Sequence, residues 1–184
     1  MTPVPSVLDD ALARRGARRF ARGELLVRPS DRHGTVWFLH EGLTRWFSVA
    51  EDGQEHVHAF PARGEWVHGA LEDPATPGCC TMPALGVEAL KPTLATGFEW
   101  GELDALRRQH VELASYLTEQ VMSRVGERLG REAALATQSA EQRYRELVVR
   151  HPDLLHEVRR QDIAGWLGIT PVAFSRLRRR VHGA

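Results

Sequence analysis

The stretch that decides the fold lies near the end of the chain and reads QDIAGWLGITPVAFSRLRRR from Gln161 to Arg180. Gly168 stands where a helix commonly ends with a residue in the left-handed conformation. Thr170 suits the N-cap of a following helix and Pro171 its first position. The stretch therefore predicts two helices joined by a short turn.

The second of these helices has two chemically different faces. At about 100° per residue, Phe174, Leu177 and Val181 share one face, which can dock on a core. The opposite face carries arginines, which can pair with guanine O6 and N7 or with phosphates, as in a recognition helix in a DNA major groove. The alternative is a helical hairpin with a basic outer face and no DNA partner. The candidate DNA-contacting residues are Thr170, Pro171, Val172, Ser175, Arg176, Arg178, Arg179 and Arg180.

Length and composition fit one compact domain or two small ones. The chain has 184 residues, 42% of them hydrophobic, and a formal net charge of zero, while four of the five residues 176–180 are arginine. That apolar content allows a packed core. The apolar runs are too short to cross a membrane, and no secretion signal is visible. The adjacent Cys79 and Cys80 cannot build a disulfide framework, so we expect a cytoplasmic protein without a membrane partner.

The first hundred residues predict short strands separated by turns. Runs rich in β-branched and aromatic residues occur at 25–27, 36–39, 44–49, 55–60 and 87–98. Asp52-Gly53 is a hairpin signal between two of them. The spacing predicts an antiparallel sandwich, jelly roll or small barrel.

Residues His110 to Ala136 predict one long helix, because apolar residues recur at steps of three, four or seven. This stripe either forms a dimer interface or packs on the chain's own β domain. Gly126 and Gly130 each cost about 1 kcal/mol of helix propensity, and they either admit a partner helix or mark a weak point. Ser139 and Gln142 form a capping box that starts another helix. The candidate interface residues are Leu113, Leu117, Val121, Val125 and Leu129.

Further motifs extend over nearly the whole chain. Those of the first half are Phe20-x-x-Gly23-Glu24, Phe38-Leu39-x-x-Gly42-Leu43-x-Arg45, Asp52-Gly53 and Phe60-x-x-x-Gly64-Glu65. Those of the second half are Gln142-Arg143-Tyr144, His151-Pro152-Asp153-Leu154-Leu155, the stretch 163–171 and Ser175-Arg176-Leu177-Arg178-Arg179. In this order they resemble the Crp/Fnr superfamily of bacterial transcription regulators.

The resemblance implies an α+β fold in three parts. Residues 1–105 would form a cyclic-nucleotide-binding-like, jelly-roll-like antiparallel β-roll sensor domain, 106–137 a dimerisation helix, and 138–184 a helix-turn-helix DNA-binding domain without a full wing. It also implies a homodimer on palindromic double-stranded DNA, with RNA polymerase as a candidate partner. An unknown small effector would occupy a pocket at Gly64, Glu65, Thr81 and Met82.

The chain departs from the family at the place where a cyclic phosphate would be held. Nucleotide-binding members carry an Arg-Ser or Arg-Thr pair after the Gly-Glu, but no arginine occurs here between Arg63 and Arg107. A phosphate without a guanidinium partner lacks its main charge-assisted bonds, so we expect no control by cyclic AMP. Two cysteines are too few for an iron–sulfur cluster. Val172 also replaces the glutamate with which many relatives read cytosine.

Other functions stay open. His56 and His58 point to one face of a strand and, with His40 or His68, would make a cupin-like metal site, although the cupin glutamate spacing and second motif are missing. A ligand-binding β-roll that acts through protein contacts is a further alternative. No phosphate loop or nucleophile elbow is present, so we expect no enzyme, metal or cofactor. The sequence leaves open the effector, the operator, activation or repression, and whether Cys79 and Cys80 are redox-active.

Overall fold

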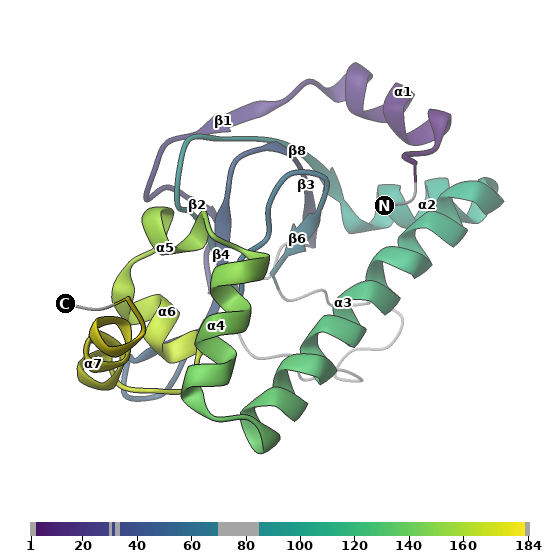
Figure 1. The fold of residues 1–184 in the computed structure, drawn as a ribbon. Helices are drawn as coiled ribbons and strands as arrows, with labels where there is room; N and C mark the ends of the chain where they lie inside the picture. The colour runs from purple at the N-terminus through teal and green to yellow at the C-terminus, as the bar shows by residue number, and fades with distance from the viewer. Residues whose placement is uncertain (1–2, 30, 32–33, 70–84, 183–184) are drawn as a thin grey trace. The chain divides into compact units, whose positions relative to one another are not determined.

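The computed structural model describes residues 3–29, 31, 34–69 and 85–182. The chain divides into two compact units, Met1–Ser123 and Arg124–Ala184, and the boundary lies inside a long helix (Figure 1). None of the helices in these described ranges is long and apolar enough to cross a membrane.

In its described residues the first unit contains two antiparallel sheets of four strands each, which confirms the predicted β-roll. One sheet has the order β1-β8-β3-β6, and the other has the order β2-β7-β4-β5. The strands of the first sheet are β1 (Arg18–Phe20), β8 (Thr93–Glu99), β3 (Thr35–Glu41) and β6 (Trp66–His68). Those of the second are β2 (Leu25–Val27), β7 (Leu85–Ala89), β4 (Thr44–Val49) and β5 (Glu55–Ala59).

Alternate residues of the strands fill the space between the two sheets. Leu39, Val67 and Val87 have no exposed surface, and they pack in one cluster with Phe20 and Trp46. Because successive strand residues point to opposite faces, the neighbour of Leu39, Phe38, lies on the other side of its sheet. There it belongs to a second apolar cluster.

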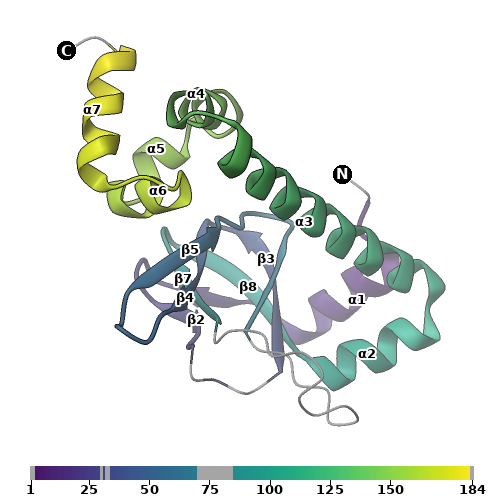
Figure 2. The ribbon, with the colours of Figure 1, turned by 90° about the horizontal axis from the view of Figure 1, so that it is seen from below.

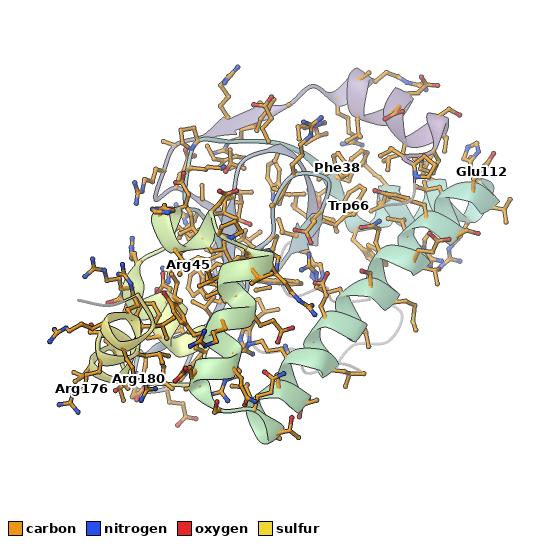
Figure 3. All side chains as sticks on the ribbon, in the orientation of Figure 1. Phe38, Arg45, Trp66, Glu112, Arg176 and Arg180 are labelled. Carbon is orange, nitrogen blue, oxygen red and sulfur yellow. The ribbon has the colours of Figure 1, made fainter. Side chains whose placement is uncertain are left out.

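Three helices cover that outer face. They are α1 (Ser6–Arg15), α2 (Trp100–Gln109) and the first turns of α3 (Val111–Thr137). Figure 3 shows Phe38 beside Trp66 in this layer, and their ring centroids are 5.1 Å apart. Helix α1 was not predicted from the sequence. Its buried residues are Leu8 and Leu12. The predicted helix at His110 to Ala136 is confirmed, and a sharp bend at His110 separates it from α2 (Figure 2).

The second unit consists of the end of α3 and four shorter helices. These are α4 (Ala140–Arg150), α5 (Leu154–Glu157), α6 (Arg160–Trp166) and α7 (Pro171–His182). The predicted capping box is confirmed: the Gln142 amide donates to Ser139 Oγ at 3.2 Å, and the Ser139 amide donates to Gln142 Oε1 at 2.8 Å. The buried side chains of these helices include Tyr144, Leu147, Ile163, Leu167, Phe174 and Leu177.

Candidate nucleic-acid interface

The turn between α6 and α7 is closed by backbone hydrogen bonds around Gly168. The Gly168 amide donates to the Gly165 carbonyl at 3.0 Å, and the Ile169 amide donates to the Ala164 carbonyl at 3.0 Å. This pair of bonds is a Schellman motif, which needs a left-handed residue at its centre. Gly168 has φ 70°, so the sequence prediction for this residue is confirmed.

Two arginines pair the last carbonyl groups of α6. Arg131, from α3, donates to the Trp166 carbonyl at 2.9 Å, and Arg143, from α4, donates to the Leu167 carbonyl at 2.8 Å. Arg143 also donates to the Gln138 carbonyl, which follows the end of α3. The final carbonyls of a helix have no partner within it, so these side chains supply the bonds that the turn lacks.

This role of Arg131 and Arg143 was not predicted from the sequence. Arg143 was part of a family motif, whereas nothing in the sequence singled out Arg131. Burial, and then repulsion from Arg128 and Arg143, lowers the pKa of Arg131 from its ordinary value. Both arginines fix where α7 begins, without belonging to α7 themselves.

The start of α7 is capped as the sequence predicted. The Ala173 amide donates to Thr170 Oγ1 at 3.2 Å, and Pro171 is the first helical residue. The Phe174 amide donates to the Thr170 carbonyl at 2.9 Å, which closes the first turn. An N-cap bond of this kind fixes the direction in which the helix leaves the turn.

The two faces of α7 differ as the sequence predicted. Phe174 and Leu177 are buried, and the ring of Phe174 meets that of Tyr144 edge to face at 5.7 Å. Figure 3 shows the Arg176 side chain directed away from the helices. Arg178 is half-buried, and the other candidates are exposed, namely Thr170, Pro171, Val172, Ser175, Arg176, Arg179 and Arg180.

Arg180 differs from the other exposed arginines. Its guanidinium lies 3.0 Å from Glu141 on α4, a carboxylate that also binds Arg145 at 2.9 Å. The hydrogen bond from Arg145 is the main cause that lowers the pKa of Glu141. Within the part of the chain that the structure describes, Arg176 and Arg179 have no such acidic partner, so these two exposed guanidinium groups of α7 are available to bind a ligand.

The apolar stripe of α3 divides into two parts. Leu113 has no exposed surface and Leu117 is half-buried, because both pack in the core of the first unit. For Leu113 this corrects the expected interface role, since its side chain has no surface left for a second subunit. Val121 and Leu129 are each 60% exposed and Val125 is 44% exposed. Met122, which the sequence analysis did not select, is exposed beside them.

The predicted effector pocket is described only in part. Gly64 has φ 84°, and Glu65 accepts a hydrogen bond from the Ala62 amide at 2.6 Å, so both residues shape the turn before β6. Thr81 and Met82, as well as Cys79 and Cys80, lie outside the described residues.

The histidines of the cupin-like alternative make separate hydrogen bonds. His58 Nε2 lies 2.8 Å from Ser48 Oγ, His40 Nε2 lies 2.8 Å from Thr96 Oγ1, and His68 Nδ1 lies 2.7 Å from the Gly69 carbonyl. Burial lowers the pKa of His40. In the described ranges, no three His, Cys, Asp or Glu side chains form a group that could hold a metal ion.

Comparison with solved structures finds similar folds in several bacterial proteins. FixK2 from Bradyrhizobium japonicum matches with a TM-score of 0.72 and 18% identity, over 90% of this chain and 83% of its own. The c-di-GMP responsive global regulator CLP from Xanthomonas campestris matches with a TM-score of 0.72 and 16% identity, over 96% and 91%. A transcriptional regulator of the crp/fnr family from Eubacterium rectale matches with a TM-score of 0.72 and 14% identity, over 97% of this chain and 82% of its own.

No family model and no curated protein matches the chain. The architecture is therefore that of the Crp/Fnr regulators, established from structure rather than from close sequence relatives.

Proposed function

We propose that this protein is a transcription regulator that binds a palindromic DNA site as a homodimer, with α7 in the major groove. The observation that carries the proposal is α7 itself. Its apolar face is buried against α4, and its opposite face presents Arg176 and Arg179 without an acidic partner in the described chain. A guanidinium can donate two parallel hydrogen bonds to guanine O6 and N7.

The rigidity of the turn supports the same function. A reading helix must hold its side chains in one register against the base pairs, and here the cap at Thr170 and the arginine-bound carbonyls fix its origin. A vestigial helical end would have no need of such a complete set of bonds. For this reason we favour the regulator over a β-roll that acts only through protein contacts.

The exposed part of the α3 stripe supports the homodimer. Val121, Met122, Val125 and Leu129 are large apolar side chains on one surface of a single helix. Contiguous exposed apolar groups of this kind commonly mark an interface. Two copies related by a two-fold axis would present two α7 helices, and therefore read a palindrome.

The control of this regulator differs from that of cyclic-AMP-binding proteins. The carboxylate of Glu65 already serves a turn, and the segment between Arg63 and Arg107 offers no guanidinium for a phosphate. We therefore propose an effector other than cyclic AMP, and RNA polymerase as the partner of the DNA-bound dimer. Calorimetry with cyclic AMP, cyclic GMP and c-di-GMP tests this, and low-micromolar binding of cyclic AMP would overturn it.

The test of DNA reading starts from a random DNA library. The full chain is used to select duplexes, and binding to the selected site is measured by fluorescence anisotropy at several salt concentrations. We expect Arg176→Ala to cost about 1–3 kcal/mol on that site and to relax preference at one base pair. Arg150→Ala removes an exposed arginine of α4 that is paired with Glu146, and should leave binding unchanged. Selection of no preferred sequence, or equal effects of the two variants, would refute the proposal.

A further inference from the structure

The first turn of α7 presents an apolar side chain to solvent on the face proposed to meet DNA. Val172 is 61% exposed, and helical periodicity places it opposite the buried Phe174 and Leu177. Its branched side chain has essentially one χ1 rotamer in a helix, so its two methyl groups point in a fixed direction. The position is apolar, rigid and open to a ligand.

The neighbours of Val172 define what it can meet. Ser175 and Arg176 follow at three and four positions, so all three side chains share one surface of α7. The α7 sequence contains no Asp or Glu, so this surface carries no carboxylate. Thr170 Oγ1 is engaged by the Ala173 amide, and Pro171 has no amide hydrogen to donate. The Val172 side chain itself therefore offers no group for a hydrogen bond to a base, and the hydroxyl of Ser175 and the guanidinium of Arg176 lie one turn further along α7.

This chemistry selects among the base edges of the major groove. Cytosine presents an amino donor, which would lose its water without gaining an acceptor beside Val172. Adenine and guanine likewise present only polar groups, whereas thymine alone presents a methyl group. An exposed valine is complementary to that methyl group alone.

We propose that Val172 reads the 5-methyl group of a thymine in the operator half-site, next to a guanine bound by Arg176. This inference rests on the proposed DNA-binding function. Side chains four apart on a helix lie about 6 Å apart, and base pairs repeat every 3.4 Å or so, which places the thymine within about two base pairs of the guanine.

The decisive experiment replaces thymine by uracil in the selected operator, which removes the methyl group and keeps the base pairing. Burial of one such carbon group corresponds to about a four-fold change in affinity. We expect a loss of about four-fold when one half-site carries uracil, and of about fifteen-fold when both do, in the wild-type protein. Uracil at thymines further from the guanine serves as the control and should have no effect.

The variant Val172→Ala links the methyl group to this side chain. Val172 is exposed, and alanine is the better helix former, so the variant should remain folded. It should bind the thymine operator more weakly, and it should no longer distinguish thymine from uracil. If the wild-type protein binds its selected site but tolerates uracil at every thymine, or if Val172→Ala keeps the full distinction, this inference is wrong and DNA binding stands. If no site is selected at all, the proposed function itself fails.

Discussion

Gly168 and Gly165 lie three residues apart, and their substitution by alanine should have opposite effects on stability. Gly168 has φ +70°, and a Cβ built there would lie 2.7 Å from Leu135 Cδ2. Gly165 lies inside α6, and a Cβ built there would have no atom of another part of the described chain within 4 Å. The two variants therefore add the same methyl group to a strained site and to an open one.

The size of each effect follows from these environments. A left-handed alanine costs about 1–2 kcal/mol, and displacing Leu135 from its rotamer costs about 0.5–1.5 kcal/mol. In Gly165→Ala the gain is about 0.5–1 kcal/mol, because alanine loses less backbone freedom than glycine in a helix. We expect the two variants to differ by about 2–4.5 kcal/mol in the free energy of unfolding of the second unit.

Hydrogen exchange followed by mass spectrometry measures the stability of the second unit separately within the full chain. Peptides from residues 140–182 report its opening, while peptides of the β-roll serve as the internal reference. Faster exchange is expected throughout these helices in Gly168→Ala and slower exchange in Gly165→Ala. Equal protection in the two variants, or greater protection in Gly168→Ala, would refute the assignment of Gly168 as the obligatory left-handed residue of the turn.

Two further predictions concern the dimer and pH. Val125→Asp places a charge on the exposed stripe of α3 and should halve the mass seen by sedimentation, whereas Val149→Asp, at an 81% exposed position of α4, should leave it unchanged. A monomeric wild-type protein would contradict the interface. Burial lowers the pKa of His40 from its ordinary 6.5, so the unfolded state binds the proton more readily, and the stability of the β-roll should fall as pH drops below that value. In His40→Gln the denaturant midpoint should depend less on pH; an unchanged dependence would exclude His40 as its source.

The fold was most predictable where local rules determine the backbone. Gly168, Thr170 and Pro171 each have one conformation that suits them at a helix boundary, so the turn followed from sequence alone. The strands at 44–49 and 55–60 were also predictable, because runs of β-branched and aromatic residues lie between strong turn signals. The two faces of α7 followed from helical periodicity.

Features that depend on tertiary contacts were not predictable in the same way. Helix α1 is short and half of its residues are polar, and its Leu8 is buried only because the outer face of a sheet lies against it. The stripe of α3 is continuous in sequence, but only the three-dimensional structure shows that Leu113 belongs to the core and Leu129 to the surface. The DNA-contacting roles of Arg176 and Arg179 remain predictions, since exposure shows only that they are available.

The hydrogen bond from Arg131 to the Trp166 carbonyl allows a test that distinguishes residues that position α7 from residues that contact DNA. Arg131 belongs to the same helix as the exposed Val125 and Leu129, and its guanidinium binds a carbonyl of the turn before α7. Arg131→Gln should therefore weaken binding to all DNA sequences, because α7 loses part of its support. It should leave the slope of affinity against salt unchanged, since a residue that touches no phosphate releases no counterion. Arg178→Ala should lower that slope by about one if Arg178 meets a phosphate. If Arg131→Gln reduces the slope as well, then Arg131 contacts the DNA backbone directly and the positioning role is wrong.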